Sequence, residues 1–178
     1  MNRILQAAHF AAIKHSQHRR KNVDATPYIN HPIEVAEHLS RIGGITDEDV
    51  LVAALLHDTI EDTETTREEI MEIFGPRVAG FVVECTDNKS LEKPERKRLQ
   101  ILTAPHKSNE AKMIKIADKT CNLASILMDP PDGWNLQRQK EYFLWAEQVV
   151  QGLLGVNVPM DRGIAKVLEQ GKMKLGAI

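Results

Sequence analysis

The sequence lacks the features that mark several large protein classes. Only two cysteines occur among 178 residues, Cys85 and Cys121, and their spacing fits neither a disulfide framework nor a thiolate metal site. We therefore expect two buried thiols in a reducing compartment. Basic residues do not outnumber acidic ones, and the formal net charge of −2 argues against a general nucleic-acid binder.

Membrane and secretion signals are missing as well. No apolar run approaches the roughly 20 residues that cross a bilayer. The N-terminal stretch 4–13 contains Gln6 and His9 and has no small-residue cleavage site, so it does not fit a signal peptide. These absences predict a cytoplasmic protein that has no membrane partner.

Alternating strand patterns and internal repeats are also missing, whereas apolar residues recur at helical spacing along almost the whole chain. Helices are expected around residues 4–12, 33–42, 70–74, 78–83, 96–102, 109–128, 140–154 and 162–174, in addition to one that Asp47 can cap and that contains His57. With 27% charged and 42% hydrophobic residues, the sequence predicts a single domain over residues 1–178. We expect an all-α helical bundle with a metal site between its central helices.

The dipeptide His57-Asp58 is the most informative feature of the chain. It closes an apolar run over 50–56, and two more acids, Glu61 and Asp62, follow one turn later. On a continuous helix, residues four apart share a face, so we expect His57 beside Glu61 and Asp58 beside Asp62. Four ionisable groups on a buried helix are unfavourable unless something compensates their desolvation, and a divalent cation would do so.

A second histidine and a further aspartate can complete a metal site. His31 precedes Pro32, a residue suited to the start of a helix, and Asp118 ends an apolar stretch and is followed four residues later by Asn122. Together with the His-Asp dipeptide they supply two imidazoles and two carboxylates. This donor set favours Mn, Fe or Zn over a thiolate centre, and it leaves positions for water and a substrate oxygen, as in catalytic sites.

Each of these residues also has a purely structural explanation. A histidine at a helix start can be a cap, a His-Asp pair can be a simple hydrogen-bonded pair, and an aspartate among lysines can form a surface ion pair. Their conjunction favours the metal site, because every candidate lies where an apolar helix meets a polar segment.

The segments TPYINHP, HDTIEDT and ADKTCNL resemble the motifs of the HD-domain metal-dependent phosphohydrolases. Within that superfamily the chain is most similar to RelA/SpoT-type hydrolase domains, above all to the small stand-alone alarmone hydrolases related to the metazoan SpoT homologue. The resemblance runs from about His15 to Leu154. The extra histidines and GYP segment of binuclear cyclic-dinucleotide enzymes are missing, so we expect one ion rather than two.

The resemblance implies hydrolysis of the 3′-pyrophosphate of guanosine tetra- or pentaphosphate (ppGpp or pppGpp) to GDP or GTP and pyrophosphate, with Mn²⁺ as the usual ion and Fe or Zn as possible substitutes. The residues that match the metal-ligand positions are His31, His57, Asp58 and Asp118. Those that match the catalytic acid pair are Glu61 and Asp62. Those that match substrate-binding positions are Arg20, Lys21, Asn122 and Ser125.

The chemistry of these residues suits a polyphosphate substrate. Arginine offers phosphate a planar fork and lysine a point charge, although Arg20 and Lys21 could equally belong to a solvated helix end. Either Glu61 or Asp62 could take the proton of the attacking water, while the other supplies the proton that the departing 3′-oxygen needs. A second basic stretch, 89–98, is expected to be a solvated loop and helix start rather than a polyphosphate guide.

Other functions remain open at this point. Another nucleotide phosphohydrolase, such as an NADPH 2′-phosphatase or a 5′-nucleotidase, would use the same metal ligands, because they act on the phosphoryl group rather than on the base. A non-catalytic nucleotide-binding module is a third possibility, although the intact acid pair weighs against it. Tyr28 and Asn30, which flank His31, could line the pocket or anchor a loop. The helical pattern does not specify an oligomeric state.

Overall fold

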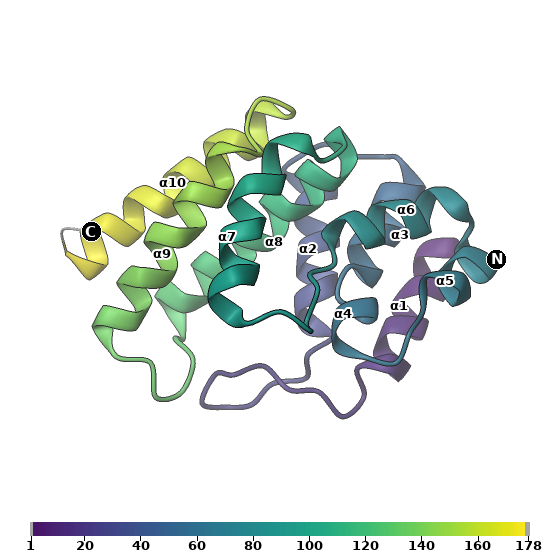
Figure 1. Cartoon of the computed structure of the whole chain (residues 1–178), viewed down its shortest axis with the longest axis horizontal. Coiled ribbons are helices and arrows are strands. Elements are labelled where there is room, and N and C mark those ends of the chain that lie inside the picture. The colour runs from purple at the N-terminus through teal and green to yellow at the C-terminus, as the bar shows by residue number, and fades with distance from the viewer. Residues whose placement is uncertain (1, 177–178) are drawn as a thin grey trace.

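The computed structural model of the protein describes residues 2–176. Within these residues all regular secondary-structure elements are helices (Figure 1). Within that range a single isolated antiparallel bridge, between Arg19 and Pro27, is the only β-type pairing. The predicted all-α bundle is therefore confirmed. The elements are α1 Arg3–Lys14, α2 Asn30–Arg41, α3 Glu48–Leu56, α4 Thr59–Asp62, α5 Arg67–Phe74, α6 Pro76–Cys85, α7 Lys93–Thr103, the 3₁₀ helix η1 Ala104–His106, α8 Asn109–Met128, α9 Leu136–Gln151 and α10 Val158–Leu175.

Helix α3 lies at the centre of one half of the bundle. Its residues 50–56 are all buried, which explains an apolar run that has no polar face. It packs against α1, α2 and α6, while the long helix α8 packs against α2, α6 and α10. Asp47 caps α3 as predicted, because its side chain accepts a hydrogen bond from the backbone of Asp49 at 3.0 Å. The arrangement brings α2, the end of α3 and the middle of α8 together (Figure 1).

The helix that was expected to continue through the His-Asp dipeptide ends earlier, at Leu56. Residues 57–58 form a turn, and the short helix α4 follows. Two side chains bond to carbonyls in the last turn of α3: the His57 ring to Ala54 O and the Thr59 hydroxyl to Leu56 O, both at 2.7 Å. Side chains that occupy backbone carbonyls in this way compete with the helix. The prediction of one continuous helix is therefore wrong.

The other helix boundaries agree closely with the predicted ranges. Helix α8 has the predicted bounds, whereas α9 and α10 each begin four residues before the predicted start. Their capping residues are Asn135 and Asn157, whose side chains accept hydrogen bonds at 2.9 and 3.2 Å from backbone N–H groups three residues later. These caps set the true helix starts.

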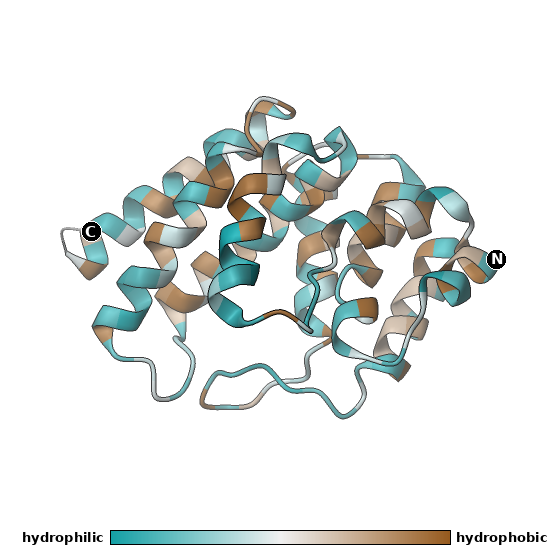
Figure 2. Ribbon diagram, viewed as in Figure 1, coloured by the Kyte–Doolittle hydropathy of each residue, from teal (hydrophilic) through white to brown (hydrophobic). Residues whose placement is uncertain are grey.

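Several predictions about the protein surface and core can be compared with the structure. Both cysteines are buried and free, as predicted. Among the described residues, no helix combines the length and the hydropathy that a membrane span needs. The connections along one edge of the bundle, including the long α1–α2 loop, are coloured mostly hydrophilic or neutral (Figure 2). That residues 1–178 form one domain stays a prediction.

The contact between α9 and α10 generates a stability prediction. A side chain at Gly171 would overlap the ring of the buried Phe143. We expect Gly171→Ala to lower the free energy of unfolding by about 1–3 kcal/mol, because overpacking forces the neighbours to shift. Gly80→Ala is the matched control: it also lies within a helix, but its added carbon meets nothing within 4 Å. Urea denaturation that shows equal stability for the two variants would contradict this packing argument.

Candidate metal centre and nucleotide cavity

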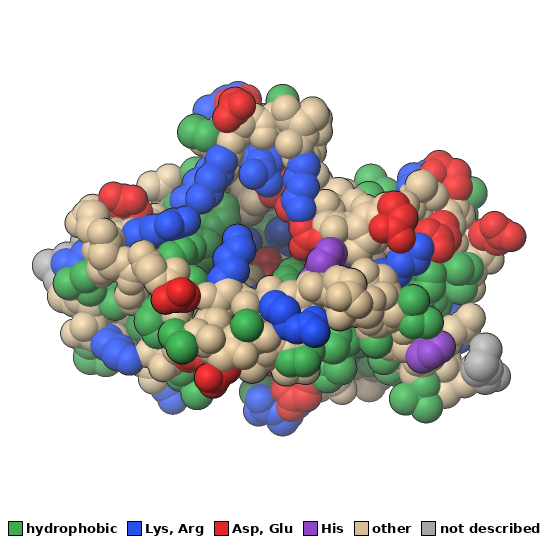
Figure 3. All heavy atoms as spheres, turned by 90° about the horizontal axis from the view of Figure 1, so that it is seen from below, with side chains coloured by type: hydrophobic (Ala, Val, Ile, Leu, Met, Phe, Trp, Pro, Cys, Tyr) green, Lys and Arg blue, Asp and Glu red, His purple; other side chains and the backbone are tan. Residues whose placement is uncertain are grey.

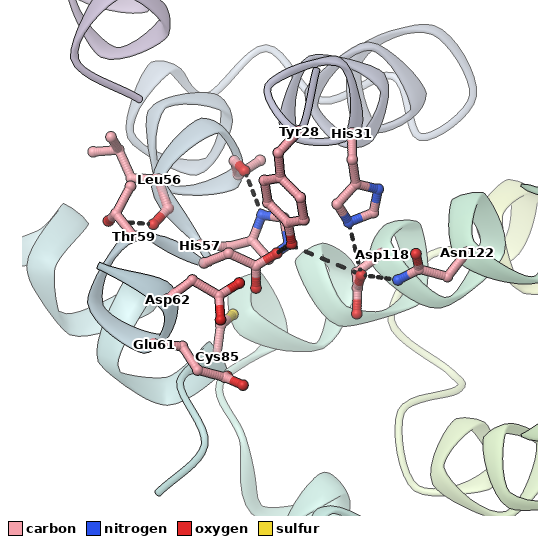
Figure 4. Close-up of polar contacts among 12 residues, drawn as sticks. Tyr28, His31, Leu56, His57, Thr59, Glu61, Asp62, Cys85, Asp118 and Asn122 are labelled. Carbon is pink, nitrogen blue, oxygen red and sulfur yellow. Dashed lines mark hydrogen bonds and ion pairs between the residues drawn. The ribbon is translucent and has the colours of Figure 1, made fainter. Parts of the chain in front are cut away.

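Three buried side chains from segments far apart in the sequence lie close together (Figure 4). His31 comes from the first turn of α2, His57 from the turn after α3, and Asp118 from the middle of α8. One ligand atom from each lies within 4.8 Å of the other two. Asp118 Oδ1 is 3.1 Å from His31 Nε2 and 3.9 Å from His57 Nε2. The arrangement could hold a metal ion.

The protonation of His57 fits a metal ligand. Its Nδ1 lies 2.7 Å from Ala54 O, and because a carbonyl can only accept, Nδ1 carries the proton. Nε2 is buried, has no hydrogen-bond partner among the described residues, and faces the carboxylates. A backbone bond that fixes the tautomer while the other ring nitrogen stays open is the usual arrangement around metal-binding histidines. The donor set therefore fits a divalent ion of the Mn, Fe or Zn type.

The electrostatics of the centre favour positive charge. Burial opposes protonation of His57, yet Asp58 and Asp118 raise its pKa to about 9. Burial also opposes ionisation of Asp118, but Lys119 and His31 hold the pKa of its carboxyl well below the ordinary value. Carboxylates that keep a proton on a fully buried imidazole attract a cation equally well, so a divalent ion would satisfy the same demand.

Asp58, the predicted fourth ligand, lies at the edge of this group. Its Oδ2 is 3.1 Å from His57 Nε2 and accepts a hydrogen bond from the Tyr28 hydroxyl. It is outside the set of three whose ligand atoms are all within 4.8 Å of one another. Tyr28 therefore lines the site, whereas its neighbour Asn30 is exposed. The role of Asp58 as a ligand stays a prediction.

The two acids of α4 point toward the α6–α7 loop. Asp87 donates its backbone N–H to Glu61 Oε2 at 3.0 Å, and Lys89 forms an ion pair with Asp62. These partners replace the stacking on His57 and Asp58 that a continuous helix would have produced. Burial raises the pKa of Glu61 above its ordinary value. A raised carboxyl pKa beside a candidate metal centre is a property of general bases.

A cavity of about 820 Å³ opens above the centre, and Figure 3 shows Lys and Arg side chains on both sides of the hollow. His31 and His57 are buried and are not among its lining residues. The other predicted site residues all line it: Arg20, Lys21, Asp58, Glu61, Asp62, Asp118, Asn122 and Ser125. The fold thus brings every sequence-predicted site residue to one place.

One wall of the cavity is the α1–α2 loop together with α8. Asn122 donates to Asp118 Oδ1 at 2.6 Å and accepts from the Arg20 guanidinium at 3.1 Å. The loop is itself tied to the α8–α9 connection. Asp132 N donates to the Lys21 carbonyl at 2.7 Å, and the Asn22 side chain donates to Asp129 at 2.8 Å.

Sequence reasoning missed the wall formed by α7 and the inner face of α8. The stretch 89–98 was expected to be a solvated loop and helix start, and it is a loop followed by the first turns of α7, with Lys89 exposed. Lys89 and the half-buried Arg96 nevertheless line the cavity, which the sequence did not indicate. Lys115 and Lys119 were missed entirely. Both are buried, and their Nζ atoms lie 3.9 and 3.1 Å from Asp118 Oδ2. Their helical spacing around Asp118 was the available signal.

Comparison with known proteins identifies the family of this chain. The family model described as HD domain matches residues 7–147. The chain belongs to the HD-domain family. Among curated proteins, this HD-domain chain is 56% identical over 171 residues to guanosine-3′,5′-bis(diphosphate) 3′-pyrophosphohydrolase MESH1 of Xenopus tropicalis, covering 91% of this chain and 96% of the relative. Its identity to MESH1 of Homo sapiens is 52% over 167 residues, covering 94% and 93%.

Solved structures extend the comparison to the fold of the HD-domain chain. A structure described as "A metazoan ortholog of SpoT hydrolyzes ppGpp and plays a role in starvation responses" matches with a TM-score of 0.93 and 46% identity, over 96% of each chain. A Listeria monocytogenes EGD-e protein matches with a TM-score of 0.67 and 33% identity, over 81% of this chain and 94% of the other. The resemblance seen in the motifs is therefore confirmed along nearly the whole chain.

The open Nε2 of His57 generates a metal-binding prediction. We expect Mn²⁺ at about 100 times its dissociation constant to stabilise the protein by about 2.7 kcal/mol. His57→Asn removes Nε2 but retains a donor near Ala54 O, so the stabilisation should disappear while the protein stays folded. His9→Asn, at an exposed position of α1, is the control and should behave like the wild type. Equal Mn²⁺-induced shifts in melting temperature for both variants would exclude His57 as a ligand.

Proposed function

We propose that this chain hydrolyses the 3′-pyrophosphate of guanosine tetra- and pentaphosphate, releasing pyrophosphate and leaving GDP or GTP. The observation that carries the proposal is the relative named for this activity, which is 56% identical and matches 91% of this chain. The cavity agrees with it. Basic walls flank the opening above the buried His-His-Asp centre, of which Asp118 lines the cavity, and such walls suit a doubly pyrophosphorylated nucleotide.

The metal centre would hold one divalent ion through His31, His57 and Asp118, with Asp58 as a fourth ligand. We propose Mn²⁺, while Fe and Zn accept the same donors. When bound, the ion would supply Lewis-acid polarisation of a phosphoryl oxygen and would acidify a water molecule.

Arg20, Lys21, Asn122 and Ser125 are proposed to bind the nucleotide. Their contacts support this role, because Arg20 and Asn122 form a hydrogen-bonded chain that ends on Asp118. A nucleotide bound along this chain would have its 3′ substituent directed at the floor of the cavity. The Arg20 fork and the Lys21 charge then suit its phosphates.

Glu61 is proposed as the general base. The Asp87 N–H fixes its Oε2, which leaves Oε1 available to accept the proton of the attacking water. Burial raises the pKa of this carboxyl above its ordinary value, which makes the carboxylate a stronger base. Asp62, which forms an ion pair with Lys89, is proposed to supply the proton that the departing 3′-oxygen requires.

The cellular setting follows from composition and stays a prediction. We infer a cytoplasmic location, a nucleotide as the binding partner, and no nucleic-acid or membrane partner, because the net charge is −2 and no described helix could span a membrane.

An Mn²⁺-dependent assay tests the proposed activity. Purified protein is incubated with guanosine tetraphosphate, with NADPH and with simple 5′-nucleotides, and the products are separated by chromatography. We expect GDP and pyrophosphate from the first substrate. Orthophosphate from NADPH or a 5′-nucleotide as the sole product would identify a different phosphohydrolase, and bound metal without turnover would indicate a binding module.

The position of Glu61 generates a mutational prediction. Glu61→Gln keeps the size and the acceptor for Asp87 N but cannot take a proton, so we expect kcat to fall by about 10²–10⁴-fold. The Mn²⁺-induced rise in melting temperature should persist. Glu64→Gln, whose side chain is 86% exposed, is the matched control and should keep full activity. Near-normal turnover of Glu61→Gln would remove this residue from the mechanism.

A further inference from the structure

We propose that Arg96 anchors a separate anion subsite, which holds the distal phosphoryl group of the 3′-pyrophosphate. The subsite is distinct from the Arg20-Lys21 wall and would let the enzyme prefer a pyrophosphoryl over a monophosphoryl substituent. The orientation of the substrate in this inference rests on the proposed function.

The first argument is the state of Arg96 itself. It lies in the first turn of α7, lines the cavity and is half-buried, and its Nε is buried without a hydrogen-bond partner among residues 2–176. No carboxylate of the described residues forms an ion pair with it. Two residues later, Arg98 is exposed and makes two hydrogen bonds to Glu95, at 2.8 and 2.7 Å. A partly desolvated guanidinium without a protein partner is suited to bind an anionic ligand.

The second argument is the contrast with the other cations of the same wall. Lys89 is paired with Asp62, and both buried lysines of α8 lie within 4.0 Å of Asp118. Each of these three cations thus has an acidic neighbour within 4.0 Å, although the two lysines of α8 share one. Arg96 is thus the cation of this wall, in the described part of the chain, whose charge has no acidic counterpart.

The third argument is the place of Arg96 relative to the acids. Asp87 donates its N–H to Glu61 and accepts a hydrogen bond from the Gln100 side chain. Gln100 lies four residues after Arg96 on α7, so the two share a face, and both line the cavity. The α7 wall therefore adjoins the Glu61 side of the centre, whereas Arg20 adjoins the Asp118 side through Asn122.

These positions give the substrate a direction. With the inner phosphorus of the 3′-pyrophosphate beside Asp118 at the metal centre and the nucleoside beside Arg20, the outer phosphoryl group extends toward Arg96. In the reaction the water oxygen bonds to the inner phosphorus and the bond from that phosphorus to the 3′-oxygen breaks. The nucleoside keeps a 3′-hydroxyl, and pyrophosphate leaves as one unit that still contacts Arg96. A 3′-monophosphate has no group at this subsite.

A pair of substrates tests the subsite. Arg96→Gln should lower kcat/KM about ten- to hundredfold on guanosine tetraphosphate, since a charge-assisted hydrogen bond contributes about that factor. On guanosine 5′-diphosphate 3′-monophosphate the same variant should change kcat/KM less than about twofold. Arg96→Lys, which keeps the charge but loses the fork, should fall between the wild type and Arg96→Gln. Arg98→Gln is the matched control on the same helix and should leave both substrates unaffected. Equal losses on both substrates, or no loss on either, would overturn the proposal.

Calorimetry provides a readout that does not depend on turnover. Inorganic pyrophosphate and orthophosphate are titrated into wild-type and Arg96→Gln protein at matched Mn²⁺ in cell and syringe. We expect pyrophosphate affinity to fall at least about tenfold in the variant while orthophosphate affinity stays unchanged. Unchanged pyrophosphate affinity would refute the subsite. If the wild type fails to hydrolyse guanosine tetraphosphate, the proposed function fails separately, and this binding result still decides the fate of the subsite.

Discussion

Burial of the Asp118 carboxylate is the constraint on which the rest of the structure depends. A charged group in the middle of a buried helix is unfavourable unless donors and cations surround it. Here His31 comes from α2, Asn122 from the next turn of α8, and Lys119 from the same turn. Because His31 comes from a helix far from α8 in the sequence, its contact with this carboxylate helps to fix how α2 packs on α8. The same contacts place hydrogen-bond donors around the candidate metal centre, where a phosphate group could bind.

The end of α3 is the second determinant of the site. A straight helix through residues 57–62 would have carried the His-Asp dipeptide and the two following acids along one surface. The bonds from His57 to Ala54 and from Thr59 to Leu56 end the helix instead. The chain then turns, so that Asp58 faces Tyr28 and the α4 acids face the α6–α7 loop. The candidate metal ligands and the proposed proton-transfer acids are thereby separated although they are adjacent in sequence.

Much of this arrangement follows from local sequence signals, and the exceptions have identifiable causes. Apolar periodicity gave the bounds of α8, and the junction of apolar and polar segments located His31, His57 and Asp118. Periodicity cannot reveal side chains that bond to backbone carbonyls, so the break after Leu56 was missed. Charge patterning cannot distinguish a cation that faces solvent from one that faces a cavity. Arg96 and Arg98 are alike in sequence, and only the packing of α7 against α9 separates them, since Arg96 lines the cavity and Arg98 is exposed.

The two hydrogen bonds that tie the α1–α2 loop to the α8–α9 connection have a further consequence. The bonds from Asp132 N to Lys21 O and from Asn22 to Asp129 join two loops into one side of the cavity rim. Loops that are already held together lose little conformational entropy when a ligand binds. In such a preorganised site, little of the free energy gained from electrostatic attraction is offset by the ordering of loops, so the attraction increases both the affinity and the association rate.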